Sequence, residues 1–112
     1  MEYNFIKRFE ELVYEEKAFL NPKLTLNELA IRIGTNRTYL SNYINHELNK
    51  TFFDFINSLR LEHATKLLLS TNMTLEVIAE KSGFNSLSTF RRYFMYVHKT
   101  SPSVYKRQNA KF

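Results

Sequence analysis

Apolar side chains recur at helical spacing along almost the whole chain. The first such stretch, residues 4–20, predicts a helix that ends at the Asn-Pro pair following it. A second stretch, residues 51–70, predicts the longest helix of the chain. The inward positions of the first are Phe5, Phe9, Leu12, Val13 and Leu20, and those of the second are Phe52, Phe55, Ile56, Leu59, Ala64, Leu67 and Leu68.

Between these stretches, the sequence "LTLNELAIRIG" predicts a short helix. Thr25 and Glu28 have the spacing of a capping box, in which each side chain satisfies a free amide at the other residue. We expect the helix to run from there to about Ile33 and to stop at Gly34, one of only two glycines in the chain.

The following stretch, "NRTYLSNYINHEL", predicts another helix, with Asn36 as its cap. Its apolar face carries Leu40, Tyr43 and Ile44. Asn49 should end it, because asparagine tolerates the left-handed backbone conformation.

The pattern then repeats at an offset of 49 residues, "LTLNELAIRIG" (24–34) aligning with "MTLEVIAEKSG" (73–83). The aligned pairs are Thr25 with Thr74, Leu26 with Leu75, Leu29 with Ile78, Ala30 with Ala79 and Gly34 with Gly83. Beyond the glycine, Leu40 and Ile44 correspond to Phe90 and Phe94 if the second copy has one extra turn residue. Each glycine therefore belongs to a duplicated unit.

In each copy the glycine ends one helix two or three residues before the next begins, so the chain must turn sharply through a positive φ. The alanine four residues earlier is small enough for the second helix to cross close over the first. These features are typical of a helix-turn-helix. Any helical hairpin can use alanine and glycine in this way, but the duplication favours the specific motif.

Composition sets the fold class. With 112 residues, two prolines and two glycines, the chain suits one small all-α domain. It has no cysteine, which excludes disulfides and thiolate metal sites. The start "MEYNFIKRFEEL" has no leader-like apolar segment, and no apolar run approaches the ~20 residues that cross a bilayer, so we expect a soluble cytoplasmic protein without a membrane partner.

Positive charge gathers in the second half of the chain, and no acidic residue follows Glu80. Seven bases stand after it: Lys81, Arg91, Arg92, Lys99, Lys106, Arg107 and Lys111. This distribution fits either a polyanionic partner such as nucleic acid or an ordinary basic tail. The outward positions of "NRTYLSNYIN" and "SLSTFRRYF" favour nucleic acid, because they carry short hydrogen-bonding groups and arginines, the side chains that read base edges in the major groove.

Four motifs in order, "LTLNELAIRIGTNRTYLSNYIN", "FFDFINSLRLEHATKLLLS", "IAEKSGFNSLSTFRRYF" and "TSPSVYKR", resemble the DNA-binding domain of the AraC/XylS family of bacterial transcription regulators. The resemblance covers about residues 24–107. It implies seven helices that form two helix-turn-helix subdomains, 1–50 and 72–112, joined by a long central helix, 51–71. It also implies that two recognition helices enter successive major grooves of double-stranded DNA, ~34 Å apart, and, since activators predominate in the family, that the protein activates transcription.

The resemblance also implies which residues contact DNA. The positions that match reading positions are Arg37, Thr38, Ser41, Asn42 and Asn45 in the first unit, and Leu87, Ser88, Arg91 and Arg92 in the second. Asn36 and Ser86 would offer helix N-terminal amides to phosphates, and Lys50 and Lys81 are weaker phosphate candidates. Leu87 suggests contact with a thymine methyl group, with half-buried packing as the close second interpretation.

The chain departs from the family pattern at the end of each recognition helix. Met95 and Tyr96 stand where the family has a basic pair, which predicts weaker phosphate anchoring there. Lys99 and Asn49 stand where glycine is usual, and we expect both turns to form with some strain at Lys99.

Two other classes of function are weighed against DNA binding. The first is an interaction module that keeps the fold but contacts another regulator or RNA polymerase, and it is supported by the apolar residues Leu87, Met95 and Tyr96. The second is an enzyme, which we do not expect: the three histidines are too scattered for a metal site, and no nucleophile elbow or phosphate loop occurs. We expect no cofactor or metal.

The chain has no segment that could sense a signal, so it is either a small regulator or the output end of a longer protein. The "NPKLTLNELA" stretch resembles output domains attached to sensor proteins, which favours the second interpretation. We expect the domain alone to be monomeric, with dimerisation left to other regions. The sequence does not identify the target DNA or the regulated genes.

Overall fold

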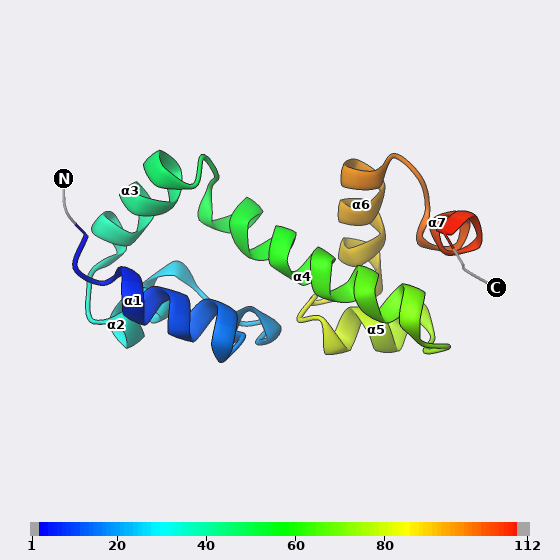
Figure 1. The fold of residues 1–112 in the computed structure, drawn as a ribbon, viewed down its shortest axis with the longest axis horizontal. Helices are drawn as coiled ribbons and strands as arrows, with labels where there is room; N and C mark the ends of the chain where they lie inside the picture. Colours follow the sequence, from blue (N-terminus) through cyan, green and yellow to red (C-terminus); the bar gives the residue numbers. More distant parts are fainter. Residues whose placement is uncertain (1–2, 110–112) are drawn as a thin grey trace. The chain divides into compact units, whose positions relative to one another are not determined.

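The computed structural model describes residues 3–109 and is all-α over this range, with no strand. Its helices are α1 (Ile6–Glu10), α2 (Leu26–Ile33), α3 (Arg37–Glu47), α4 (Phe52–Ser70), α5 (Leu75–Lys81), α6 (Leu87–His98) and α7 (Pro102–Asn109) (Figure 1). The seven described α-helices confirm the expected fold class.

The prediction of one continuous helix at the start of the chain is wrong. The stretch expected to be one helix over 4–20 consists of α1, a π-helical segment (Glu11–Glu15) and a short 3-10 turn (Ala18–Leu20). The π-segment is marked by the Glu16 amide, which donates to the Glu11 carbonyl five residues earlier at 2.8 Å. Lys17 then takes a left-handed conformation (φ 53°), which interrupts the helix before its expected end.

The chain divides into two compact units, Met1–Ile56 and Asn57–Phe112, with the division inside α4. The expected subdomain limits of 1–50, 51–71 and 72–112 stay a prediction. In the first unit, α2 packs on α3. The inward positions predicted for α3 are confirmed, since Leu40, Tyr43 and Ile44 are all buried.

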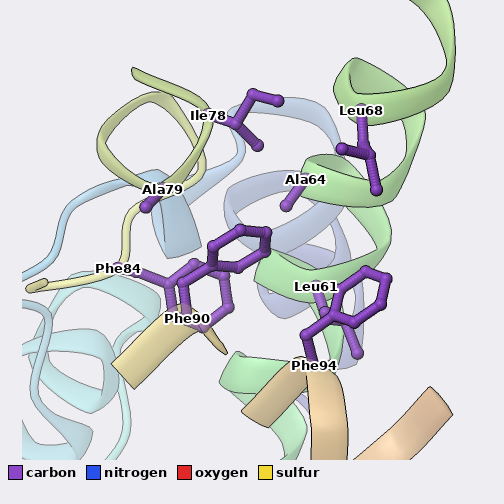
Figure 2. Close-up of a cluster of buried hydrophobic side chains, with 8 residues drawn as sticks. All are labelled: Leu61, Ala64, Leu68, Ile78, Ala79, Phe84, Phe90 and Phe94. Atoms are coloured by element: carbon purple, nitrogen blue, oxygen red, sulfur yellow. The ribbon is translucent and has the colours of Figure 1, made fainter. Parts of the chain in front are cut away.

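The core of the second unit is a cluster of buried apolar side chains from α4, α5, α6 and the turn between the last two. Its members are Leu61, Ala64, Leu68, Ile78, Ala79, Phe84, Phe90 and Phe94. Figure 2 shows these side chains converging from the three helices, with the Phe84 and Phe90 rings together. Their ring centroids are 5.3 Å apart. This core holds the second recognition helix of the predicted motif.

Burial confirms the internal repeat. Leu40 and Ile44 of α3 have no exposed surface, and neither do Phe90 and Phe94 of α6, which lie 50 residues later. The shift from 49 to 50 is the single extra turn residue that the alignment required.

In α4, the predicted interior is correct in part. Phe55, Ile56, Ala64 and Leu68 are buried, whereas Phe52, Leu59 and Leu67 are only half-buried. The buried residues that the pattern did not select are Leu61 and the polar pair Asn57 and Arg60. Arg60 donates to Asn57 Oδ1 at 3.4 Å, and burial lowers the pKa of its guanidinium.

Candidate nucleic-acid interface

Both predicted turns have the same backbone hydrogen bonds. In the first, Gly34 has φ 84°, its amide donates to Ile31 O at 3.1 Å, and the Thr35 amide donates to Ala30 O at 2.9 Å. This pair of bonds is the Schellman motif, which satisfies the last carbonyls of a helix through a left-handed residue.

The second turn repeats this geometry 49 residues later. Gly83 has φ 88°, its amide donates to Glu80 O at 3.2 Å, and the Phe84 amide donates to Ala79 O at 3.0 Å. The prediction that each glycine supplies a positive φ is therefore confirmed at both sites.

The N-caps of the two duplicated units are also confirmed. Thr25 Oγ1 accepts from the Glu28 amide at 3.1 Å, and Thr74 Oγ1 accepts from the Val77 amide at 3.2 Å. The recognition-helix caps follow the same rule. Asn36 Oδ1 accepts from the Tyr39 amide at 2.9 Å, while Ser86 Oγ accepts from the Thr89 amide at 3.1 Å.

These bonds show which amides at each helix N-terminus stay available for an anion. The Asn36 and Ser86 side chains each satisfy the third amide of their helix, so they fix where the helix begins. The first two amides, which have no acceptor within a helix, are those of Arg37 and Thr38 in α3 and of Leu87 and Ser88 in α6. They form the part of each N-terminus that suits a phosphate.

The outward face of α3 carries the polar residues that the sequence selected. Arg37, Thr38 and Asn45 are exposed, and Ser41 and Asn42 are half-buried. Asn45 Nδ2 donates to Ser41 Oγ at 3.4 Å, which links two of these groups along the helix. The five residues therefore lie on the solvent side of α3, opposite its buried face.

Aromatic rings of the N-terminal segment pack against the buried face of α3, a contact that was not predicted from the sequence. The Tyr43 ring lies 5.2 Å from Tyr3, 5.6 Å from Phe5 and 5.2 Å from Phe9, measured between centroids. Burial, and secondly the nearby Glu10 carboxylate, raises the pKa of the Tyr43 hydroxyl. These ring contacts pack α3 against the N-terminal segment.

On α6, Ser88, Arg91 and Arg92 are exposed, as is the Ser86 cap. Leu87 is half-buried and packs against the core of the second unit. This agrees with the packing interpretation of Leu87, which the sequence offered beside a thymine contact. Thr89 was not among the predicted site residues, although its Oγ1 accepts from Ser86 Oγ at 3.0 Å. Its position three residues after the cap could have indicated this contact, because a cap bonds to groups at that spacing.

The basic side chains fall into two groups. Within residues 3–109, Arg37, Arg91 and Arg92 take part in no ion pair, whereas Arg8, Arg32 and Lys66 each pair with a glutamate. Arginines without a carboxylate partner keep their five donors for another ligand. Lys50 and Lys81 are exposed.

One of the seven basic residues after Glu80, which were expected to stand without a partner, is engaged within the fold. Lys106 Nζ donates to Thr71 O at 2.7 Å, just after the end of α4, where a cation is favoured by the helix dipole. Lys106 thus serves the fold. Lys111 lies outside the described residues.

Beyond Arg92, α6 ends in a surface of different character. Met95, Tyr96 and Val97 are exposed, and Lys99 closes the helix in a left-handed conformation (φ 60°). His98 faces inward, with its ring 4.4 Å from Phe94 and 4.6 Å from Tyr105, and burial lowers the pKa of its imidazole.

Neither a metal site nor a membrane span is found in the part of the chain that the structure describes. No group of three or more His, Cys, Asp or Glu side chains is placed to hold an ion there. None of the described helices combines the length and apolarity needed to cross a bilayer.

Comparison with known proteins places this geometry among transcription regulators. Residues 29–108 match the family described as "Helix-turn-helix domain". An HTH-type transcriptional regulator of Staphylococcus aureus (strain COL) is 34% identical over 83 residues, which are 74% of this chain and 11% of that protein. The chain spans 11% to 35% of the length of the curated relatives it matches.

Two solved structures share the fold. The C-terminal domain of AraT, a response regulator from Geobacillus stearothermophilus, is 29% identical, with a TM-score of 0.87 over 98% of this chain and 89% of that one. The DNA-binding domain of AdpA, a global transcriptional factor solved with its target DNA, is 18% identical, with a TM-score of 0.79 over 88% of each chain. At 18% identity the second likeness concerns the fold alone.

Proposed function

This chain belongs to the AraC/XylS family of helix-turn-helix transcription regulators, whose domains bind specific sequences of double-stranded DNA, and we propose that it reads its target through the outward faces of α3 and α6. The observation that carries this proposal is the duplicated turn. Each Schellman glycine is followed by a capped helix whose exposed face holds short polar groups or arginines without carboxylate partners.

The chemistry of these side chains assigns their roles. Arg91 and Arg92 suit bidentate bonds to the O6 and N7 of guanine, and Asn42 and Asn45 suit the N6 and N7 of adenine. The hydroxyls that accompany them belong to Thr38, Ser41 and Ser88. Arg37 stands at the start of α3, where base and phosphate are both within reach of a long side chain.

Phosphates are the proposed ligands of the helix N-termini and the surface lysines. The free amides after Asn36 and after Ser86 would each hold one backbone phosphate, which fixes the helix in its groove. Lys50 and Lys81 would add non-specific attraction. For Leu87, packing against the core is the role we favour over a thymine contact.

The proposed mode places α3 and α6 in successive major grooves, about one turn or ~34 Å apart. Selection from random duplexes, followed by footprinting, tests it: we expect enrichment of a site with two specified blocks about 10 base pairs apart. If selection enriches no sequence, the proposal is wrong.

The matched variants are Arg91→Ala and Lys66→Ala. Each removes one positive charge, but Lys66 is exposed and paired with Glu62 at 3.5 Å. We expect Arg91→Ala to weaken binding about ten- to a hundredfold and to relax preference at one base pair. Lys66→Ala should change affinity less than about twofold. A fold check by circular dichroism accompanies both variants.

The exposed Met95, Tyr96 and Val97 favour a second candidate, a contact with another protein such as RNA polymerase. Arg91→Ala separates the two functions, because a protein interface formed by these apolar side chains would survive it while DNA binding would not. Activation of transcription is proposed from the family resemblance alone, and a reporter with the selected site upstream of a promoter checks its sign.

We also propose that the isolated domain is monomeric and acts in the cytoplasm, where bacterial DNA lies. Sedimentation of the free domain tests the first point. A concentration-dependent dimer would contradict it.

A further inference from the structure

A tyrosine in the last turn of α6 and the lysine that caps this helix are not part of the reading face described above. Tyr96 lies four residues after Arg92, so the two side chains share one face of the helix, about 6 Å apart along its axis. Tyr96 is 68% exposed. Lys99, which closes the helix, is exposed as well.

Backbone geometry holds Lys99 in an unusual place. It is one of three non-glycine residues with positive φ in the described chain, and its counterpart at the end of α3 is Asn49, a residue that tolerates this conformation better. Lysine pays a conformational cost there that glycine would avoid. The bend turns its side chain back along α6, where its Nζ lies 5.3 Å from the centroid of the Tyr96 ring.

A cation at this distance over a tyrosine ring is attracted by the electron-rich face, which limits where the ammonium can go. No ion pair involves Lys99 in the part of the chain that the structure describes. The sequence has no acidic residue after Glu80 that could supply one locally. The ammonium therefore keeps hydrogen-bond donors for an external acceptor, and the phenol offers one more.

We infer that the Tyr96 hydroxyl and the Lys99 ammonium together bind one phosphate of the DNA backbone, beside the groove that α6 enters. A phosphodiester carries one negative charge and accepts several hydrogen bonds, which matches one cation and two kinds of donor. The pair restores a positive contact near the position where Met95 and Tyr96 replace a basic pair. This inference rests on the proposed function, because it requires α6 to lie on DNA.

Lys99→Gly gives the sharpest test, because it should weaken binding without lowering the stability of the fold. Glycine removes the cation but also relieves the positive φ, so thermal stability should stay equal or rise. The slope of log affinity against log salt should fall in magnitude by about 0.9, the value for one lost phosphate contact. If the contact contributes nothing at 1 M salt, that slope corresponds to about fivefold weaker binding of the selected duplex at 0.15 M salt.

Three further variants complete the experiment. Lys99→Arg keeps a cation that can stack on the ring and should retain the wild-type slope. Tyr96→Phe keeps the ring and loses the hydroxyl, so affinity should fall roughly two- to tenfold with the slope unchanged. Lys66→Ala, the exposed lysine of the same unit, should leave the slope within error of wild type.

The outcomes are distinguishable. If wild-type protein binds no duplex specifically, the proposed function and this inference both fall. If it binds and Lys99→Gly leaves the slope unchanged, only the phosphate contact of Lys99 is refuted. If Tyr96→Phe binds as wild type does, the hydroxyl has no part in the contact.

Discussion

Replacing Gly34 with alanine tests whether the first turn needs glycine for its backbone conformation or for space. The residue has φ +84°, a region that L-residues with a side chain rarely adopt. A Cβ placed on it would meet no heavy atom within 4 Å apart from its chain neighbours. The structure therefore predicts a conformational cost and no steric one.

The expected size follows from these two facts. A left-handed non-glycine residue costs ~1–2 kcal/mol, and alanine recovers ~0.4–1 kcal/mol by restricting the unfolded chain. Gly34→Ala should therefore lower the free energy of unfolding by about 1 kcal/mol. For 112 residues this corresponds to a fall in Tm of about 4 °C. Gly34→Asn should lose less, because asparagine is enriched in this conformation.

Urea denaturation of both variants and the wild type, followed by circular dichroism, measures the difference, with unchanged m-values as the check on two-state behaviour. Below its Tm, Gly34→Ala should still bind the selected duplex. A loss above about 3 kcal/mol would reveal a steric requirement at the turn, and a gain in stability would show that the positive φ is not maintained. Either result refutes the reasoning.

Three other predictions concern burial, capping and pH. Phe94→Ala removes a fully buried ring that contacts Phe90 and Tyr105, so the free energy of unfolding should fall by about 3–5 kcal/mol in urea melts; a loss below 1 would contradict the packing. Asn36→Ala and Ser86→Ala each remove an N-cap bond and should cost about 1 kcal/mol in the same assay, with equal stability as the contrary result. Because burial lowers the pKa of His98 below its usual 6.5, the unfolded chain takes up the proton first, so stability should be constant above pH 6.5 and decline as the pH falls toward the folded value. His98→Phe should reduce that decline, as seen by urea melts at pH 7.5 and pH 5, and an identical pH dependence would refute it.

Much of this fold was predictable because its decisive features are local. A cap residue acts on an amide three positions away, and a Schellman glycine acts on carbonyls within its own helix, so both can be recognised in a short window of sequence. The burial of Leu40, Ile44, Phe90 and Phe94 followed from period and repeat alone.

Features that depend on distant partners escaped prediction. Lys106 looked like one base of an open cluster until it was placed against Thr71, 35 residues away. Ser82 is completely buried and lies 3.3 Å from His63 Nδ1, an arrangement that no spacing rule indicates. The break at Lys17 is a third case, since nothing in the apolar period of residues 4–20 requires a left-handed lysine there.

The same distinction applies to the candidate interface. Which face of α3 or α6 is exposed follows from period, and so does the set of side chains on it. Which of those side chains are already engaged follows only in part: the Asn36 cap was predicted from the sequence, but the Asn45 bond to Ser41 became visible only in three dimensions. Contact with DNA at each position stays a prediction.

The two copies share a turn but differ in the chemistry of their recognition helices. The exposed face of α3 has one arginine, Arg37, among short polar groups, and Lys50 follows the helix. By contrast, α6 has Arg91 and Arg92, and Lys99 follows it. Because salt dependence counts neutralised phosphates and short polar groups neutralise none, the second unit should supply more of the salt-sensitive affinity than the first. Asn42→Ala should then weaken binding to the selected site with the same loss at 0.05 and 0.2 M salt, while the loss caused by Lys99→Gly should shrink as salt rises. Equal salt behaviour of the two variants would show that this division of roles between the copies is wrong.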